Sequence, residues 1–271
     1  MYFLDPHLNR YNNQVHVVVA GCGGTGGWLA EDLCRVYQAV PEVTLVLVDP
    51  DRVEPQNLVR QNFLPGEVDE FKAQALAERL AKKYRRPVAY CPGGFSSYQG
   101  PKAIVLGCVD NPAARQEIAS TFPHNGLYSR PGWWVDSGNG VNWGQVLVGN
   151  SHKDGLGHAF DAETQRCRAL PLPTLQRPEL LASDPAPIES EDLACAEAIQ
   201  AGDQSPTINR LMAALTTEVV RRLLAGTCPW MALAADLDLG EVRPTFATPE
   251  VVARMMRIPK KRLLTSAQQG R

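Results

Sequence analysis

A glycine-rich turn between a short apolar strand and a helix constrains the fold of this chain more than any other feature. Residues 15–20 read VHVVVA, the turn that follows reads GCGGTG, and a second apolar run at 43–48 ends on Asp49. Such continuous β-branched runs are typical of strands buried on both faces of a parallel sheet. Together these elements predict half of a nucleotide-binding βαβ unit.

Strands and helices continue to alternate along the rest of the chain. Helical spacing of apolar residues predicts helices over 25–37, 67–84, 111–122 and 206–224. Strands are predicted over 87–90, 103–109, 133–136 and 144–149, and a hairpin over 231–245. This pattern predicts an α/β fold: a Rossmann-like, mostly parallel, doubly wound sheet with an antiparallel C-terminal extension.

We expect one domain made of three consecutive segments. Residues 1–150 form the nucleotide-binding core and begin with a polar arm over 1–13. Residues 151–205 are rich in proline, serine and acidic residues and show little periodicity, which indicates a lid or crossover segment. Residues 206–271 supply the long helix and the hairpin that complete the same domain.

Charge and cysteine content exclude several classes of function. The chain has 27 basic and 29 acidic residues, a net charge of -2, so nothing in its global charge predicts a nucleic-acid partner. No apolar run approaches the roughly 20 residues of a membrane span, and the N-terminus lacks the order of a signal peptide. Seven scattered cysteines without a C-x-x-C pair predict reduced thiols and no zinc. We therefore expect a soluble, cytoplasmic protein.

The turn itself supplies the first candidate ligand-binding residues. Glycines here let backbone amides approach a ligand closely and direct a helix N-terminus at negative charge; they are Gly21, Gly23, Gly24 and Gly26. Glycine can alternatively serve only to pack a helix on a strand. Asp49 is placed to accept hydrogen bonds from ribose hydroxyls. Up to this point NAD and ATP fit equally well.

The loop after the second strand distinguishes the two nucleotides. Its polar residues and the start of the next helix give the candidates Asp51, Asn57, Arg60, Gln61 and Lys72. A dinucleotide needs only backbone amides around its pyrophosphate, whereas a triphosphate undergoing displacement needs cations to stabilise developing charge. Arg60 and Lys72 therefore favour ATP. The alternative is that both are solvated surface charges.

A further carboxylate ends the strand over 103–109, in the sequence GCVDNPAAR. Asp110, with Asn111 beside it, lies at the carboxyl edge of the predicted sheet, where open α/β folds bind ligands. A carboxylate facing a triphosphate is a natural Mg²⁺ ligand. The competing interpretation is a helix cap, made by Asp110 itself or by Asn111, with Arg115 as a surface charge.

The motifs GCGGTG, VDPDRVEPQNLVRQ and CVDNPAAR, together with Lys72, resemble the ThiF/MoeB/ubiquitin-activating superfamily of adenylyltransferases over about the first half of the chain. The stretches VDSGNGVNWGQVLVG and LACAEAIQAGDQSPTIN are similar to a narrower branch, the ThiF-family protein of the PRTRC system. The resemblance implies that ATP meets a small ubiquitin-like β-grasp protein with a Gly-Gly-type tail. The terminal carboxylate of that protein attacks the α-phosphate, and pyrophosphate leaves.

The resemblance also implies roles for single residues. It gives Asp49 to the ribose and Asp110 to magnesium, and it gives the phosphates to Asn57, Arg60 and Lys72. No general base is needed, because the attacking carboxylate is already ionised; positioning and charge neutralisation then supply the catalysis. In several relatives an N-terminal arginine reaches the partner subunit's ATP site, which makes Arg10 a candidate in a homodimer.

Cys195 lies where thioester- or persulfide-forming relatives keep a reactive cysteine, just before the helix over 206–224. A thiolate there could take the acyl group from the adenylate, whereas a free cysteine is otherwise a small buried apolar residue. The two C-x-x-C pairs that hold zinc in many relatives are missing. The basic stretch ARMMRIPKKRLL fits either a partner-docking helix or a solvated terminal helix.

The sequence leaves three functions open, and the first has the most support. The first is an ATP- and Mg²⁺-dependent adenylyltransferase. The second is a non-catalytic ATP-binding scaffold within a multi-protein system, which would keep the same motifs without turnover. The third is an NAD-dependent oxidoreductase, which uses the glycine turn and Asp49 but leaves Arg60, Lys72 and Asp110 without a task.

Overall fold

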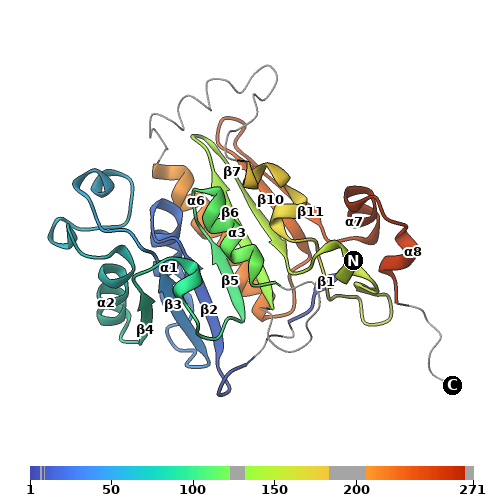
Figure 1. The fold of residues 1–271 in the computed structure, drawn as a ribbon, viewed down its shortest axis with the longest axis horizontal. Coiled ribbons are helices and arrows are strands. Elements are labelled where there is room, and N and C mark those ends of the chain that lie inside the picture. The colour runs from blue at the N-terminus through green and yellow to red at the C-terminus, as the bar shows by residue number, and fades with distance from the viewer. Residues whose placement is uncertain (7, 9, 123–131, 183–205, 266–271) are drawn as a thin grey trace.

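A computed structural model describes the chain apart from residues 7, 9, 123–131, 183–205 and 266–271. In this part an eight-stranded sheet crosses the molecule in the order β11-β10-β7-β6-β5-β2-β3-β4 (Figure 1). Five neighbouring strands are parallel: β2 (Val15–Ala20), β3 (Val43–Val48), β4 (Val88–Cys91), β5 (Ile104–Gly107) and β6 (Trp133–Asn139). The antiparallel extension consists of β7 (Trp143–Gly149), β10 (Trp230–Asp236) and β11 (Glu241–Phe246). The predicted mostly parallel α/β sheet is confirmed.

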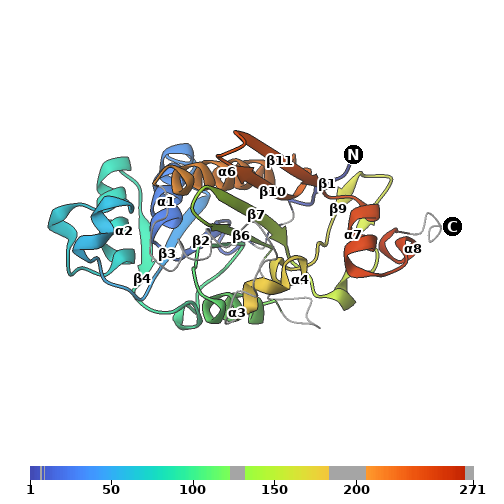
Figure 2. The same cartoon turned by 90° about the horizontal axis from the view of Figure 1, so that it is seen from above.

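Helices cover both faces of this sheet (Figure 2). One face carries α1 (Gly24–Val36), α2 (Lys72–Tyr84) and α6 (Pro206–Leu224), and the other carries α3 (Pro112–Ser120) and the short α4 (Pro173–Gln176). Successive residues of a strand point to opposite faces: Val17 and Val19 enter the larger core under α1, while Val18 enters the smaller core under α3. Burial on both sides explains why the strand sequences are continuously apolar.

Residues 151–182 are packed against both ends of the chain. β8 (Phe160–Asp161), β9 (Arg166–Cys167) and β1 (Phe3–Leu4) form a second, three-stranded sheet, and short 3₁₀ turns lie over Lys153–Leu156 and Pro178–Leu181. The terminal helices α7 (Pro249–Met256) and α8 (Lys260–Leu263) follow β11, and the Thr265 N–H donates to the Phe160 carbonyl at 2.9 Å. The rest of the predicted lid lies outside the described residues, and the three-segment division stays a prediction.

Two predicted helix starts are corrected. The helix predicted from Glu67 begins at Lys72, because a 3₁₀ turn over Pro65–Glu67 is followed by Asp69 in the left-handed region, with φ of 71°. The helix predicted from Asn111 begins at Pro112, with Asn111 outside it as the cap. Further 3₁₀ turns cover Pro55–Val59 and Phe95–Ser97. Among the described helices, none has the length and apolarity to cross a membrane.

Candidate nucleotide-binding site

The glycine turn lies at the carboxyl edge of the sheet, where β3 and β5 flank β2 on opposite sides. Such a switch point is where open α/β sheets bind ligands. Gly21 has φ of 88°, and a Cβ there would lie 2.6 Å from the Cys108 carbonyl oxygen. A Cβ on Gly26 would lie 1.8 Å from the Gly21 oxygen. These two glycines therefore let the turn close against itself and against β5, whereas Gly23 meets nothing nearer than the Gln61 side chain at 3.8 Å.

The start of α1 is open to an anion. Gly23 is its N-cap residue, and no described side chain caps the helix or places an acid in its first turn. The first amides of a helix lack intrahelical partners and carry the positive end of the helix dipole. A phosphate group fits this combination of free donors and partial positive charge.

Asp49 fastens the turn to the loop that follows β3. One carboxylate oxygen accepts from the Cys22 N–H at 2.6 Å and the other from the Asp51 N–H at 2.8 Å. Burial raises the pKa of Asp49, while these two amides and the nearby Lys72 act to lower it. Each oxygen keeps a second lone pair, so the predicted bond from a ribose hydroxyl is compatible with this structural role.

Lys72 brings a buried cation to the same place. Its Nζ lies 2.8 Å from Asp51 Oδ2; the lysine side chain is 10% exposed and the aspartate side chain 63%. Lys72 is also the first residue of α2, where a positive charge opposes the helix dipole. The ion pair with Asp51 offsets this unfavourable placement.

The loop between β3 and α2 is ordered by its own polar residues. Asn57 is buried, and its Oδ1 accepts from the Glu54 N–H at 2.9 Å, which caps the turn over Pro55–Val59. Half-buried Arg60 ends this turn, and its N–H donates to the Asn57 carbonyl at 3.3 Å. Asn57 therefore has a structural role, because it holds the turn that leads into Arg60 and Gln61.

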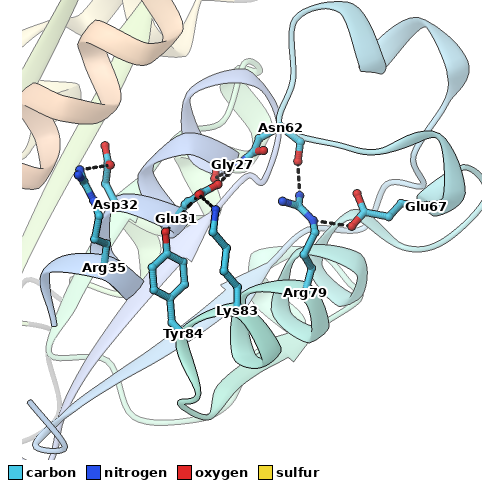
Figure 3. A network of polar contacts seen from close by, with 9 residues as sticks. All are labelled: Gly27, Glu31, Asp32, Arg35, Asn62, Glu67, Arg79, Lys83 and Tyr84. Carbon is cyan, nitrogen blue, oxygen red and sulfur yellow. Dashed lines mark hydrogen bonds and ion pairs between the residues drawn. The ribbon is translucent and has the colours of Figure 1, made fainter. Parts of the chain in front are cut away.

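A network of polar contacts holds the far end of this loop between α1 and α2 (Figure 3). Asn62 donates to Glu31 at 2.8 Å, and Lys83 donates to the same carboxylate at 2.5 Å. Arg79 donates to Glu67 at 2.6 Å and to the Asn62 carbonyl at 2.5 Å. Burial acts to raise the pKa of Glu31, but its hydrogen bonds prevail and the pKa is lowered. No sequence pattern predicts this network, because its members come from three separate elements.

Asp110 stands exposed beyond β5, and the interpretation of Asp110 as the helix cap is wrong. Asn111 is the cap, because its Oδ1 accepts from the Ala114 N–H at 2.8 Å. Asp110 accepts only a weak bond from the Asn111 amide, at 3.3 Å. A single exposed carboxylate fits Mg²⁺, which takes its other ligands from phosphate and water. Across the described residues no three His, Cys, Asp or Glu side chains gather as a metal site.

Two buried clusters near this edge were not predicted. Arg115, expected as a surface charge, is buried and lies 3.3 Å from the fully buried Asp136. Burial raises the pKa of Asp136, and Arg115 acts to lower it. The second cluster joins Thr25, Asn139 and Asn209: the Thr25 hydroxyl donates to Asn139 Oδ1 at 3.0 Å, and Asn139 Nδ2 donates to Asn209 Oδ1 at 3.1 Å. The only sequence signal was that both asparagines fall within the two stretches resembling the narrower branch.

For two predicted residues the role stays a prediction. Cys195 lies outside the described residues. Arg10 is exposed on the N-terminal arm, and its reach into a partner's site stays a prediction. Cys22 and Cys108, which border the turn, have thiol pKa values raised by burial, so neither resembles an activated nucleophile.

Solved structures share this fold. Escherichia coli MccB with succinimide superposes with a TM-score of 0.55 at 15% identity, covering 86% of this chain and 64% of that one. PaaA gives a TM-score of 0.57 at 16% identity, covering 86% of this chain and 73% of that one. MccB with ATP gives 0.55 at 16% identity, covering 86% and 63%. The chain therefore spans about two thirds of these structures.

A curated relative and a family model also match the sequence. The adenylyltransferase and sulfurtransferase uba4 of Neosartorya fischeri is 37% identical over 107 residues, which are 39% of this chain and 20% of that relative. The model of the ThiF family matches residues 5–227. Because this match spans most of the sequence, the chain belongs to the ThiF family.

Proposed function

We propose that this protein is an ATP-dependent adenylyltransferase that activates the C-terminal carboxylate of a small ubiquitin-like β-grasp protein. The observation that carries the proposal is the convergence at one sheet edge of an uncapped helix start, the buried Lys72 and the exposed Asp110. A dinucleotide would leave the lysine and the second carboxylate unused. The relative named as an adenylyltransferase and the MccB structure named with ATP support the same choice.

In the proposed reaction a carboxylate oxygen of the partner forms a bond to the α-phosphorus, and the bond to the pyrophosphate oxygen breaks. The amides of α1 hold the phosphates, and Asp49 accepts from the ribose. Lys72 and Arg60 neutralise charge that grows on the phosphate oxygens. Mg²⁺ held by Asp110 would supply further charge neutralisation, and no proton needs to move because the carboxylate is ionised.

Pyrophosphate exchange tests this proposal directly. The purified protein is mixed with Mg-ATP, labelled pyrophosphate and each Gly-Gly-tailed β-grasp protein encoded near its gene. Label should enter ATP with the cognate partner and not with the same partner lacking its last two residues. Lys72→Met should reduce exchange at least 100-fold, whereas Lys82→Met, an exposed lysine on the same helix, should leave it unchanged. Absence of exchange with every partner would refute the proposal.

The rival functions give different results in the same experiment. ATP binding without exchange would favour a scaffold, and a larger thermal shift with NAD than with ATP would favour an oxidoreductase. A thioester on Cys195, a homodimer and membership of the PRTRC branch are finer parts of our proposal. The branch rests on the resemblance of the stretches around Asn139 and Cys195, the thioester on the position of Cys195, and the homodimer on the relatives whose N-terminal arginine Arg10 would match.

A further inference from the structure

α6 begins beside the start of α1. The Thr25 hydroxyl lies 3.3 Å from Asn209 Oδ1, and the Arg210 guanidinium stacks 4.5 Å from the centre of the Trp28 ring. Thr25 and Asn209 both belong to the first turns of their helices. The two helices therefore start at the same sheet edge (Figures 1 and 2). Two positive dipole ends placed together repel each other unless an anion lies between them.

The orientation of the Asn209 amide is fixed by its neighbours. Asn139 Nδ2 donates to the Gly140 carbonyl and to Asn209 Oδ1, each at 3.1 Å. Turning the Asn209 amide over would set one NH₂ group against another. Oδ1 therefore faces Asn139, and the whole amide lies against the first turn of α1, where a Cβ on Gly24 would meet Nδ2 at 2.6 Å and Oδ1 at 3.0 Å.

Asn209 Nδ2 is a buried donor that has no acceptor among the described residues. The residue is only 1% exposed, and an unpaired donor at this depth is destabilising. Nδ2 lies 2.6 Å from the position that a Cβ on Gly24 would occupy. Gly24 is thus glycine because the amide reaches this close to the helix start.

We infer that Asn209 donates a hydrogen bond from Nδ2 to a phosphate oxygen of the bound nucleotide. α6 then supplies a neutral side-chain donor to the anion that α1 binds. Asn139 and Thr25 are positioning residues that keep the amide turned toward the site. The inference rests on the proposed function, since the phosphate belongs to ATP.

Two substitutions test the donor. Asn209→Ala removes it, and Asn209→Asp keeps the shape while adding a negative charge. Calorimetric titrations compare Mg-ATP with adenosine, which has no phosphate. Both variants should lose at least 10-fold in affinity for Mg-ATP, Asn209→Asp the more, while adenosine affinity changes less than twofold. Thr216→Val, another buried polar residue of α6 that bonds only within its helix, should change neither.

The comparison of ligands separates a donor from a merely structural residue. Equal losses for ATP and adenosine, or no loss for ATP, would overturn the inference while leaving ATP binding by the wild type intact. If the wild type binds no ATP, the proposed function and the inference fall together. If Asn209→Asp does not fold, the affinity ratio in Asn209→Ala decides.

Discussion

The ion pair of Lys72 and Asp51 predicts an asymmetry that stability measurements can detect. The lysine side chain is 10% exposed and the aspartate 63%, so only the ammonium depends on its partner for solvation. Lys72→Met keeps the aliphatic stem and leaves Asp51, a carboxylate that water reaches, while the buried Asp49 near Lys72 keeps its two backbone N–H donors. We expect this change to cost less than about 1 kcal/mol, as for exposed pairs.

Asp51→Asn has the opposite effect, because it leaves a buried ammonium without its counter-ion. Breaking a fully buried pair costs about 3–5 kcal/mol. Here water reaches the aspartate side of the pair, and we expect about 1–3 kcal/mol. The double variant should be more stable than Asp51→Asn alone, since the unpaired charge is gone. Neither backbone bond of Asp51 involves its side chain, so the substitution isolates the charge.

Urea titrations at pH 7 on the wild type, both single variants and the double variant measure these free energies of unfolding. Saturating Mg-ATP should restore Asp51→Asn more than it stabilises the wild type, because a phosphate would take the place of the lost carboxylate. A double variant less stable than Asp51→Asn, or a larger loss for Lys72→Met, would refute the reasoning.

Three further results are expected. Gly26→Ala should destabilise the protein by more than about 3 kcal/mol, because its Cβ would meet the Gly21 backbone. Gly66→Ala, with open space around it, should not change the melting temperature. Equal shifts in melting temperature for the two variants would contradict this prediction. The lowered pKa of Glu31 means that its ionised carboxylate stabilises the folded state above about pH 5 and that this stabilisation is lost on acidification. Glu31→Gln should therefore reduce the fall in the urea unfolding midpoint as the pH is lowered. An unchanged pH dependence of the midpoint would contradict this. Cys195→Ala should keep pyrophosphate exchange but lose a reducible adduct with the partner; a surviving adduct would place the nucleophile elsewhere.

Local patterns carried the prediction of the parallel half of the fold. The strands over 15–20 and 43–48 were predicted to the residue, because burial on both faces demands an unbroken apolar run. The start of α2 was predicted wrongly because apolar spacing cannot reveal that Asp69 is left-handed. The residue at which a helix begins or ends depends on the backbone conformation of single residues. The spacing of apolar residues is a pattern over several turns and does not reveal that conformation.

By itself the sequence determined the nucleotide-binding core, the glycine turn and the charged residues around it, since each lies within a short segment whose pattern is local. Only the tertiary structure decided that Asp51 pairs with Lys72, that Asn111 rather than Asp110 caps α3, and that Asn209 faces the glycine turn from 184 residues beyond Thr25. These contacts join elements that lie apart in the sequence, and no sequence pattern predicts which of their residues will meet. Burial and hydrogen-bond geometry select them only after the sheet has brought its strand ends together.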